Sequence, residues 1–152
     1  MGGQGVPLNL DAWDGYAACR ARVQANLLHY AANPVVLAGD THNAWAFNLR
    51  DEQANPVGVE VGTPGISSPG FESYLPVAPE VLKAALLASS PELVEAETQS
   101  RGWAEVELTP RAMRARWHYV STVLDRKYDV STSQTLICMA GDRAFSDDKK
   151  AN

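Results

Sequence analysis

The sequence contains few cysteines, fewer basic than acidic residues and no long hydrophobic run. No apolar run approaches the roughly 20 residues that a helix needs to cross a bilayer. The 13 lysines and arginines are outnumbered by 18 aspartates and glutamates, which gives a net charge of −5. A protein that binds nucleic acid electrostatically presents a basic face instead. We therefore expect neither a membrane span nor nucleic acid as a structural partner.

The cysteines and the N-terminal segment say little about the compartment. Cys19 and Cys138 are far apart and lie in apolar surroundings, which fits neither a C-x-x-C redox motif nor a zinc site. We predict two buried or half-buried thiols, and a disulfide between them has no support. Residues 1–7 are glycine-rich and lack both a basic and an apolar region, so we do not expect them to form a signal peptide.

The composition is that of a folded domain. The chain has 152 residues, of which 45% are hydrophobic and 20% charged, as is typical of one soluble globular domain. Its acidic balance does not exclude phosphate as a ligand, because bound metal ions can invert the charge of a site.

Hydrophobic spacing predicts a layered α+β or α/β fold with more strand than a free-standing doubly wound domain has. The run at 35–38 is wholly apolar, which predicts a strand buried on both faces. Residues 62–70 are too rich in glycine and proline for regular structure, and residues 91–100 are ambiguous. The expected elements are a helix at 16–30, strands at 35–38, 44–49 and 57–61, a helix at 78–88, a β-hairpin of 102–108 and 115–122, a last strand within 132–139, and a charged tail at 145–152.

The strongest chemical signal is Gly39-Asp40-Thr41-His42, directly after the apolar run. Ligands bind at the carboxyl ends of strands in layered α/β folds. Carboxylate oxygen and imidazole nitrogen are the usual protein ligands of catalytic divalent metals. In the alternative reading, Asp40 only caps a turn and His42 is a surface residue. The spacing alone does not decide between the two readings.

Four blocks in order resemble segments of the PhoD-like alkaline phosphatases, which belong to the calcineurin-like metallophosphoesterases. Tyrosine is commoner in that family at the position of Trp103. The blocks span about residues 9–124. They are Trp13-Asp14-Gly15-Tyr16, the strand and Gly-Asp-x-His motif from Val35 to Trp45, the segment from Glu60 to Pro69, and the hairpin from Arg101 to Val123.

This resemblance implies a fold, an activity and ligands. The fold would be part of a metallophosphoesterase β-sandwich with flanking helices and a C-terminal β-hairpin. The activity would be hydrolysis of phosphate esters by metal-activated water. Asp40 and His42 would be metal ligands, and the metals would be calcium and iron, Ca²⁺ and Fe³⁺, by analogy with the family.

Four other residues are weaker candidates for roles near such a site. Asn43 and Thr41 flank the ligands and could hydrogen-bond phosphate or orient His42. Asp14 could lie behind the site or cap a helix. Glu60 lies in an apolar strand, and a buried carboxylate there needs a partner such as an arginine or the loop backbone.

The family's early aspartate block and its Asn-His block have no counterpart here, and two ligands do not hold a metal cluster. We therefore expect residues 1–144 to form the C-terminal part of a PhoD-like domain that is inactive or weakly active alone. Its partner would be the missing N-terminal part or a second copy of the chain. A non-catalytic scaffold or binding module is the alternative. The resemblance also implies a periplasmic or secreted location.

Overall fold

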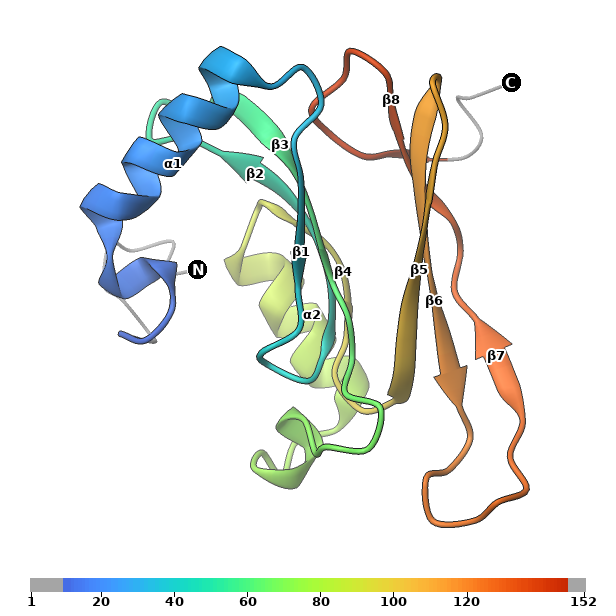
Figure 1. Ribbon diagram of the computed structural model, residues 1–152. Helices are drawn as coiled ribbons and strands as arrows, with labels where there is room; N and C mark the ends of the chain where they lie inside the picture. The colour runs from blue at the N-terminus through green and yellow to red at the C-terminus, as the bar shows by residue number, and fades with distance from the viewer. Residues whose placement is uncertain (1–9, 148–152) are drawn as a thin grey trace.

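The computed structural model describes residues 10–147, which form two β-sheets packed face to face with helices on the outside of the first sheet (Figure 1). This layered α+β fold is the predicted class. The elements are η1 (Trp13–Gly15), α1 (Ala17–Tyr30), β1 (Val35–Ala38), β2 (Ala44–Arg50), β3 (Pro56–Gly62), η2 (Phe71–Ser73), α2 (Pro79–Ser89), β4 (Leu93–Glu97), β5 (Arg101–Leu108), β6 (Ala112–Val120), β7 (Val130–Thr132), β8 (Leu136–Met139) and β9 (Ser146–Asp147).

The first sheet has the order β1-β3-β2-β4, with β1 parallel to β3 and the other pairs antiparallel. The prediction for residues 35–38 is wrong in one respect. β1 is a strand, but it lies at the edge of the sheet and none of its residues is fully buried. Leu37 is 67% exposed because nothing in the described part of the chain covers that side of the edge strand. An apolar run therefore identified the strand but not its burial.

The second sheet has the order β5-β6-β8-β9, and β7 pairs with the end of β6. The predicted hairpin is β5 and β6, which pair from Arg101↔Val120 to Leu108↔Met113. The predicted last strand is two short strands, β7 and β8, because the chain turns between them. The charged tail begins differently from the prediction, since β9 pairs with β8. Residues 148–152 lie outside the described residues.

The main core lies between the two sheets and follows the alternation of their strands. Alternate residues of β2 and β3 meet alternate residues of β6 and β8 there. Trp117 is 1% exposed, and its indole Nε1 donates to the carbonyl oxygen of Gly62 at 2.8 Å. Because a buried indole N–H needs an acceptor, this bond joins the two sheets at the carboxyl end of β3. The core residues are Ala44, Ala46, Val59, Val61, Met113, Ala115, Trp117 and Cys138.

The other face of the first sheet is covered by helices. Trp45, Phe47, Leu93 and Ala96 form a second cluster, against which Leu86 and Leu87 of α2 pack. The ambiguous segment at 91–100 contains β4, a strand that the sequence did not reveal. Its outward residues face α2, so burial within the tertiary fold decides its conformation over weak local preference.

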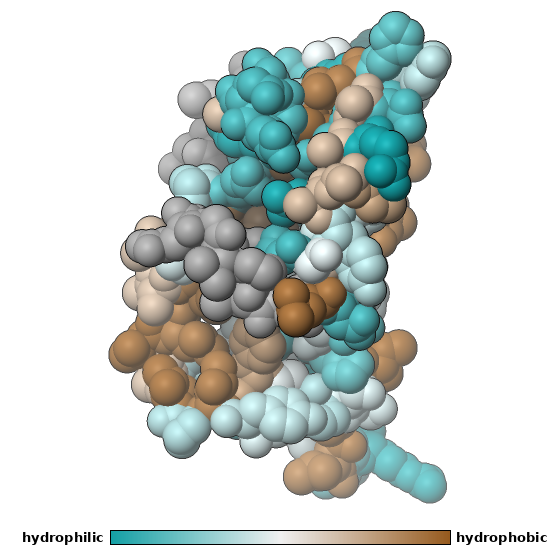
Figure 2. Space-filling view, turned by 90° about the vertical axis from the view of Figure 1, so that its left-hand side faces the viewer, coloured by the Kyte–Doolittle hydropathy of each residue, from teal (hydrophilic) through white to brown (hydrophobic). Residues whose placement is uncertain are grey.

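The helix α1 matches its predicted range, but none of its residues is buried. Its C-terminal end is held by Arg143, whose Nη2 donates to the carbonyls of Leu28 at 3.2 Å and Ala31 at 2.6 Å. A cation at the last carbonyls satisfies acceptors that the helix leaves open. Figure 2 views this helix side of the molecule and shows a cluster of hydrophilic residues at the upper left and a cluster of hydrophobic residues at the lower left.

The two cysteines differ in burial. Cys138 is buried and Cys19 half-buried, and both are free thiols, as predicted. Burial raises the pKa of the Cys138 thiol, which keeps it protonated and poorly reactive. In the described residues, no helix is long and apolar enough to span a membrane.

Candidate metal-binding turn

The candidate site is the turn that follows β1, from Gly39 to Asn43. The amide of His42 donates to the carbonyl of Gly39 at 3.1 Å and closes the turn. His42 has a φ of 59°, in the left-handed region that few residues other than glycine adopt. Such backbone strain persists only where surrounding contacts determine the conformation.

Asn43 supplies much of that surrounding structure. Its side chain is 1% exposed. The amide Nδ2 donates to the carbonyl of Thr41 at 2.5 Å, and Oδ1 accepts from the amide of Phe71 at 3.1 Å. The side chain therefore joins the turn to the loop before α2, so Asn43 has a structural task that accounts for its burial.

Thr41 is held from the opposite side. Its Oγ1 accepts a hydrogen bond from the indole Nε1 of Trp45 at 2.6 Å, and Trp45 belongs to the buried cluster on the helix side. The carbonyl of His42 accepts from the amide of Gly65 at 3.1 Å. Thr41, His42 and Asn43 are thus each hydrogen-bonded to a residue outside the turn.

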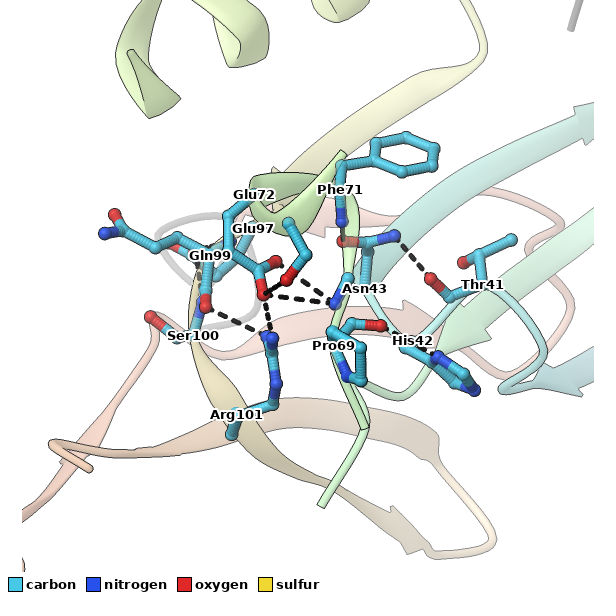
Figure 3. Close-up of polar contacts among 12 residues, drawn as sticks. Thr41, His42, Asn43, Pro69, Phe71, Glu72, Glu97, Gln99, Ser100 and Arg101 are labelled. Carbon is cyan, nitrogen blue, oxygen red and sulfur yellow. Dashed lines mark hydrogen bonds and ion pairs between the residues drawn. The ribbon is translucent and has the colours of Figure 1, made fainter. Parts of the chain in front are cut away.

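The imidazole of His42 has a defined tautomer. Nδ1 lies 2.9 Å from the carbonyl oxygen of Pro69 (Figure 3). A carbonyl can only accept, so Nδ1 carries the hydrogen and the neutral ring keeps a lone pair on Nε2. No residue within 10–147 hydrogen-bonds to Nε2. A histidine that ligates a metal almost always donates its other N–H to a carbonyl or carboxylate, and His42 has that arrangement.

Asp40 lies two residues before His42 in the same turn and is exposed. No hydrogen bond to its carboxylate comes from the described residues. The turn therefore presents one carboxylate and one imidazole lone pair, a donor set that suits a divalent or trivalent metal. Nowhere in residues 10–147 do three His, Cys, Asp or Glu side chains meet as a metal site. The fit is therefore to part of a site.

The two more distant candidates have other surroundings. Asp14 forms an ion pair with Arg20 of α1 at 3.0 Å. Glu60 lies opposite Phe47 on the helix-covered face of the first sheet. Burial raises the pKa of Glu60, and the partner expected for it is absent from the described part of the chain. The structure gives neither residue a contact with His42.

Three residues near the turn had not been singled out from the sequence. Pro69 supplies the acceptor for His42, and Glu72 and Arg101 form an ion pair beside it. Arg101 opens β5, so the second sheet reaches the loop that carries Pro69. No sequence signal identifies a backbone carbonyl as a partner, because every residue has one.

The fold and the turn together define a layered α+β protein with a carboxylate and an imidazole in the turn at the carboxyl end of a strand. A family model described as PhoD-like phosphatase matches residues 2–117. The chain belongs to this family, which confirms the resemblance read from its four blocks.

Comparison with solved structures agrees at the level of the fold. A structure of PhoD matches with a TM-score of 0.66 and 24% sequence identity, over 88% of this chain and 25% of that chain. The protein thus spans about a quarter of the length of that structure. No curated protein matches the chain.

Proposed function

We propose that this chain supplies Asp40 and His42 as ligands to the metal centre of a phosphate-ester hydrolase. The observation that most supports it is the hydrogen bond from His42 Nδ1 to Pro69, which leaves Nε2 available beside the exposed carboxylate of Asp40. Membership of a phosphatase family gives the reaction class. Metal dependence rests on the chemistry of the two side chains.

Each ligand has a definable task. The carboxylate of Asp40 is a hard oxygen donor that suits calcium, and a mixed nitrogen and oxygen set suits iron. Ca²⁺ and Fe³⁺ are therefore the ions we propose. When bound, such metals stabilise phosphoryl oxygens and activate a water molecule. Asn43 and Thr41 hold the backbone that aims both ligands, and His42 stays in one tautomer.

We further propose that other ligands come from a polypeptide segment outside residues 10–147. Two protein ligands do not hold a catalytic metal against water, because catalytic sites use at least three. The exposed edge strand β1, with Leu37, adjoins the turn and offers unpaired backbone to such a segment. A non-catalytic scaffold with the same fold is the competing function.

The test compares the chain alone with the chain co-expressed with a polypeptide that carries the family's N-terminal blocks. Iron and calcium are measured by mass spectrometry, and turnover is measured with p-nitrophenyl phosphate. We expect bound metal and turnover only in the combination. Asp40→Asn and His42→Ala should each lower turnover by about 100-fold or more. His29→Ala is the matched control, because His29 is an exposed histidine on α1.

Three results would contradict the proposal. Full metal content and turnover in the chain alone would mean that it assembles a complete site without another segment. An active combination that tolerates both Asp40→Asn and His42→Ala would remove the proposed ligands. A combination that assembles without metal or turnover would favour the scaffold.

A further inference from the structure

The peptide group between Pro69 and Gly70 is hydrogen-bonded at both ends. Its carbonyl oxygen accepts from Nδ1 of His42 at 2.9 Å. Its N–H, which belongs to Gly70, donates to both carboxylate oxygens of Glu72 at 3.2 and 3.1 Å. Figure 3 shows these groups in line, with the imidazole on one side of the loop and Glu72 on the other. One planar peptide thus lies between a histidine and a carboxylate.

Glu72 is held in place as an anion. Nη2 of Arg101 pairs with its Oε1, and the hydroxyl of Ser73 donates to the same oxygen at 3.0 Å. Burial by itself would raise the pKa of Glu72. The hydrogen bonds from Arg101, Ser73 and the Gly70 backbone together outweigh burial and hold the pKa below its ordinary value. The carboxylate therefore carries its charge at neutral pH.

Arg101 is fixed in turn by the strand that it opens. Its Nη1 donates to the carbonyl of Gln99 at 3.0 Å. The amides of Gln99 and Ser100 donate to Oε1 of Glu97 at 2.7 and 2.9 Å. The side chain of Arg101 is 12% exposed and that of Glu72 is 26% exposed, so the pair is partly covered.

The close approach at Gly70 shows that this packing is specific. A Cβ placed on Gly70 would lie 2.5 Å from Oδ1 of Asn43 and 3.0 Å from Oε2 of Glu72. Glycine is the residue whose backbone can lie between these two side chains. The loop thus brings the peptide within reach of Glu72 while Asn43 holds the turn from the other side.

We propose that Glu72 is a positioning residue for His42 and acts through the Pro69–Gly70 peptide. A peptide is a conjugated unit, so an anion that accepts from its N–H polarises its carbonyl and makes it a stronger acceptor. A stronger acceptor holds the hydrogen on Nδ1 of His42 and makes the Nε2 lone pair a better donor to metal. This inference rests on the proposed ligand role of His42. It adds to the proposed function a charged group, Glu72, that does not contact the imidazole ring of His42.

The test is the tautomer of His42 in the metal-free chain, read from the nitrogen shifts of the ring at about pH 8.5, where an ordinary imidazole is neutral. We expect the wild-type ring to be predominantly protonated on Nδ1. Glu72→Gln keeps the shape and an acceptor for Gly70 but removes the charge. A change of 10–30% in the strength of the hydrogen bond corresponds to a fall of up to about twofold in the Nδ1–H to Nε2–H ratio.

Controls separate tuning from loss of structure. The backbone amide spectrum shows whether Glu72→Gln keeps the fold. If it does not, Arg101→Met removes the cation that partly neutralises the Glu72 carboxylate. The carboxylate then accepts more strongly from Gly70, so the ratio should rise. Glu105→Gln removes another carboxylate that is paired with an arginine, and it should leave His42 unchanged. Glu72→Asp, which restores the charge at a shorter reach, should give an intermediate ratio.

An unchanged His42 ratio in folded Glu72→Gln or Arg101→Met would overturn the proposal. That outcome is distinct from failure of the proposed function, because the tautomer is measured without metal or substrate. A chain that never binds metal could still show the predicted change. Conversely, a working metal site with no tautomer change would leave Glu72 as a purely structural residue.

Discussion

Two histidines of this protein lie in similar polar surroundings but differ in what their rings have left to offer. His42 donates from Nδ1 to a backbone carbonyl and keeps Nε2 without a partner from residues 10–147. His118 on β6 uses both nitrogens. Nε2 bonds Glu105 at 2.7 Å, and Nδ1 bonds Thr132 at 3.1 Å. A carboxylate–arginine pair lies close to each histidine.

The difference separates a candidate ligand from a structural histidine. The ring of His118 also stacks on Trp103, with centroids 5.0 Å apart, so its face and both nitrogens are engaged. It joins three strands and has no free lone pair when neutral. His42 is held equally firmly, by one nitrogen and a strained backbone, and it leaves the other nitrogen open. A histidine that is fixed yet incompletely bonded is the better candidate for function.

The largest expected effect concerns Gly102, which lies between the two regions. Its amide donates to Gly65 in the loop near His42, and a Cβ on it would lie 1.8 Å from the carbonyl oxygen of His118. Gly102→Ala should therefore destabilise the fold by about 3 kcal/mol or more, measured by urea denaturation. Gly141→Ala is the control. Its Cβ would meet nothing within 4 Å, but its φ is 92°, so we expect a loss of about 1 kcal/mol. Equal losses would contradict the steric explanation.

The second prediction compares one hydrogen-bonding side chain from each region. Asn43→Ala leaves the amide of Phe71 and the carbonyl of Thr41 without their partner in a buried place. We expect a loss of about 1–3 kcal/mol in the free energy of unfolding. Thr132→Ala removes an exposed hydroxyl from His118 and should cost less than about 1 kcal/mol. A larger loss for Thr132 would mean that the hairpin, rather than the turn, is the rigid region.

The third prediction uses Glu60. Unlike Glu72 and Glu105, it has no arginine partner within residues 10–147. Its folded pKa lies above the ordinary value of 4.5 because burial disfavours its charge. Ionisation therefore costs stability as pH rises above 4.5, and the cost is absent below it, where both states are protonated. Glu60→Gln should stabilise the protein at pH 7 and have little effect at pH 4. Thermal unfolding at both pH values measures this, and a loss of stability at pH 7 would show that the charged form has a favourable role.

The smallest expected effect has the opposite sign and concerns Glu105. Hydrogen bonds from Arg116 and then His118 hold its pKa at about 2, below the ordinary 4.5. The stabilisation is present above pH 4.5 and is lost as the pH falls through 4.5 towards 2. Glu105→Gln should therefore be destabilising at neutral pH, by a small amount because the pair is exposed. The wild-type and variant curves should converge near pH 2, and a difference that persisted there would not come from the charge.

Much of the fold was predictable because local patterns and tertiary burial agree. The ranges of α1, β2, β3 and α2 and the β5–β6 hairpin follow from apolar spacing and from the turns that bound them. β4 was missed because its sequence, Leu-Val-Glu-Ala-Glu, has no strong preference of its own. The apolar run at β1 was misread as doubly buried, since residue type reports hydrophobicity and not which neighbours are present.

The candidate site divides in the same way. The sequence by itself determined the Gly-Asp-x-His turn after a strand, the two candidate ligands and the family to which the chain belongs. Only the tertiary structure decided that Pro69 takes the Nδ1 hydrogen of His42, that Asn43 is buried beneath the turn, and that Glu72 and Arg101 meet behind that loop. The donor atoms of a side chain are fixed by its covalent structure, so the sequence alone identifies candidate ligands. The tautomer of His42 and the charges near its imidazole depend on groups that come into contact only when the two sheets pack together.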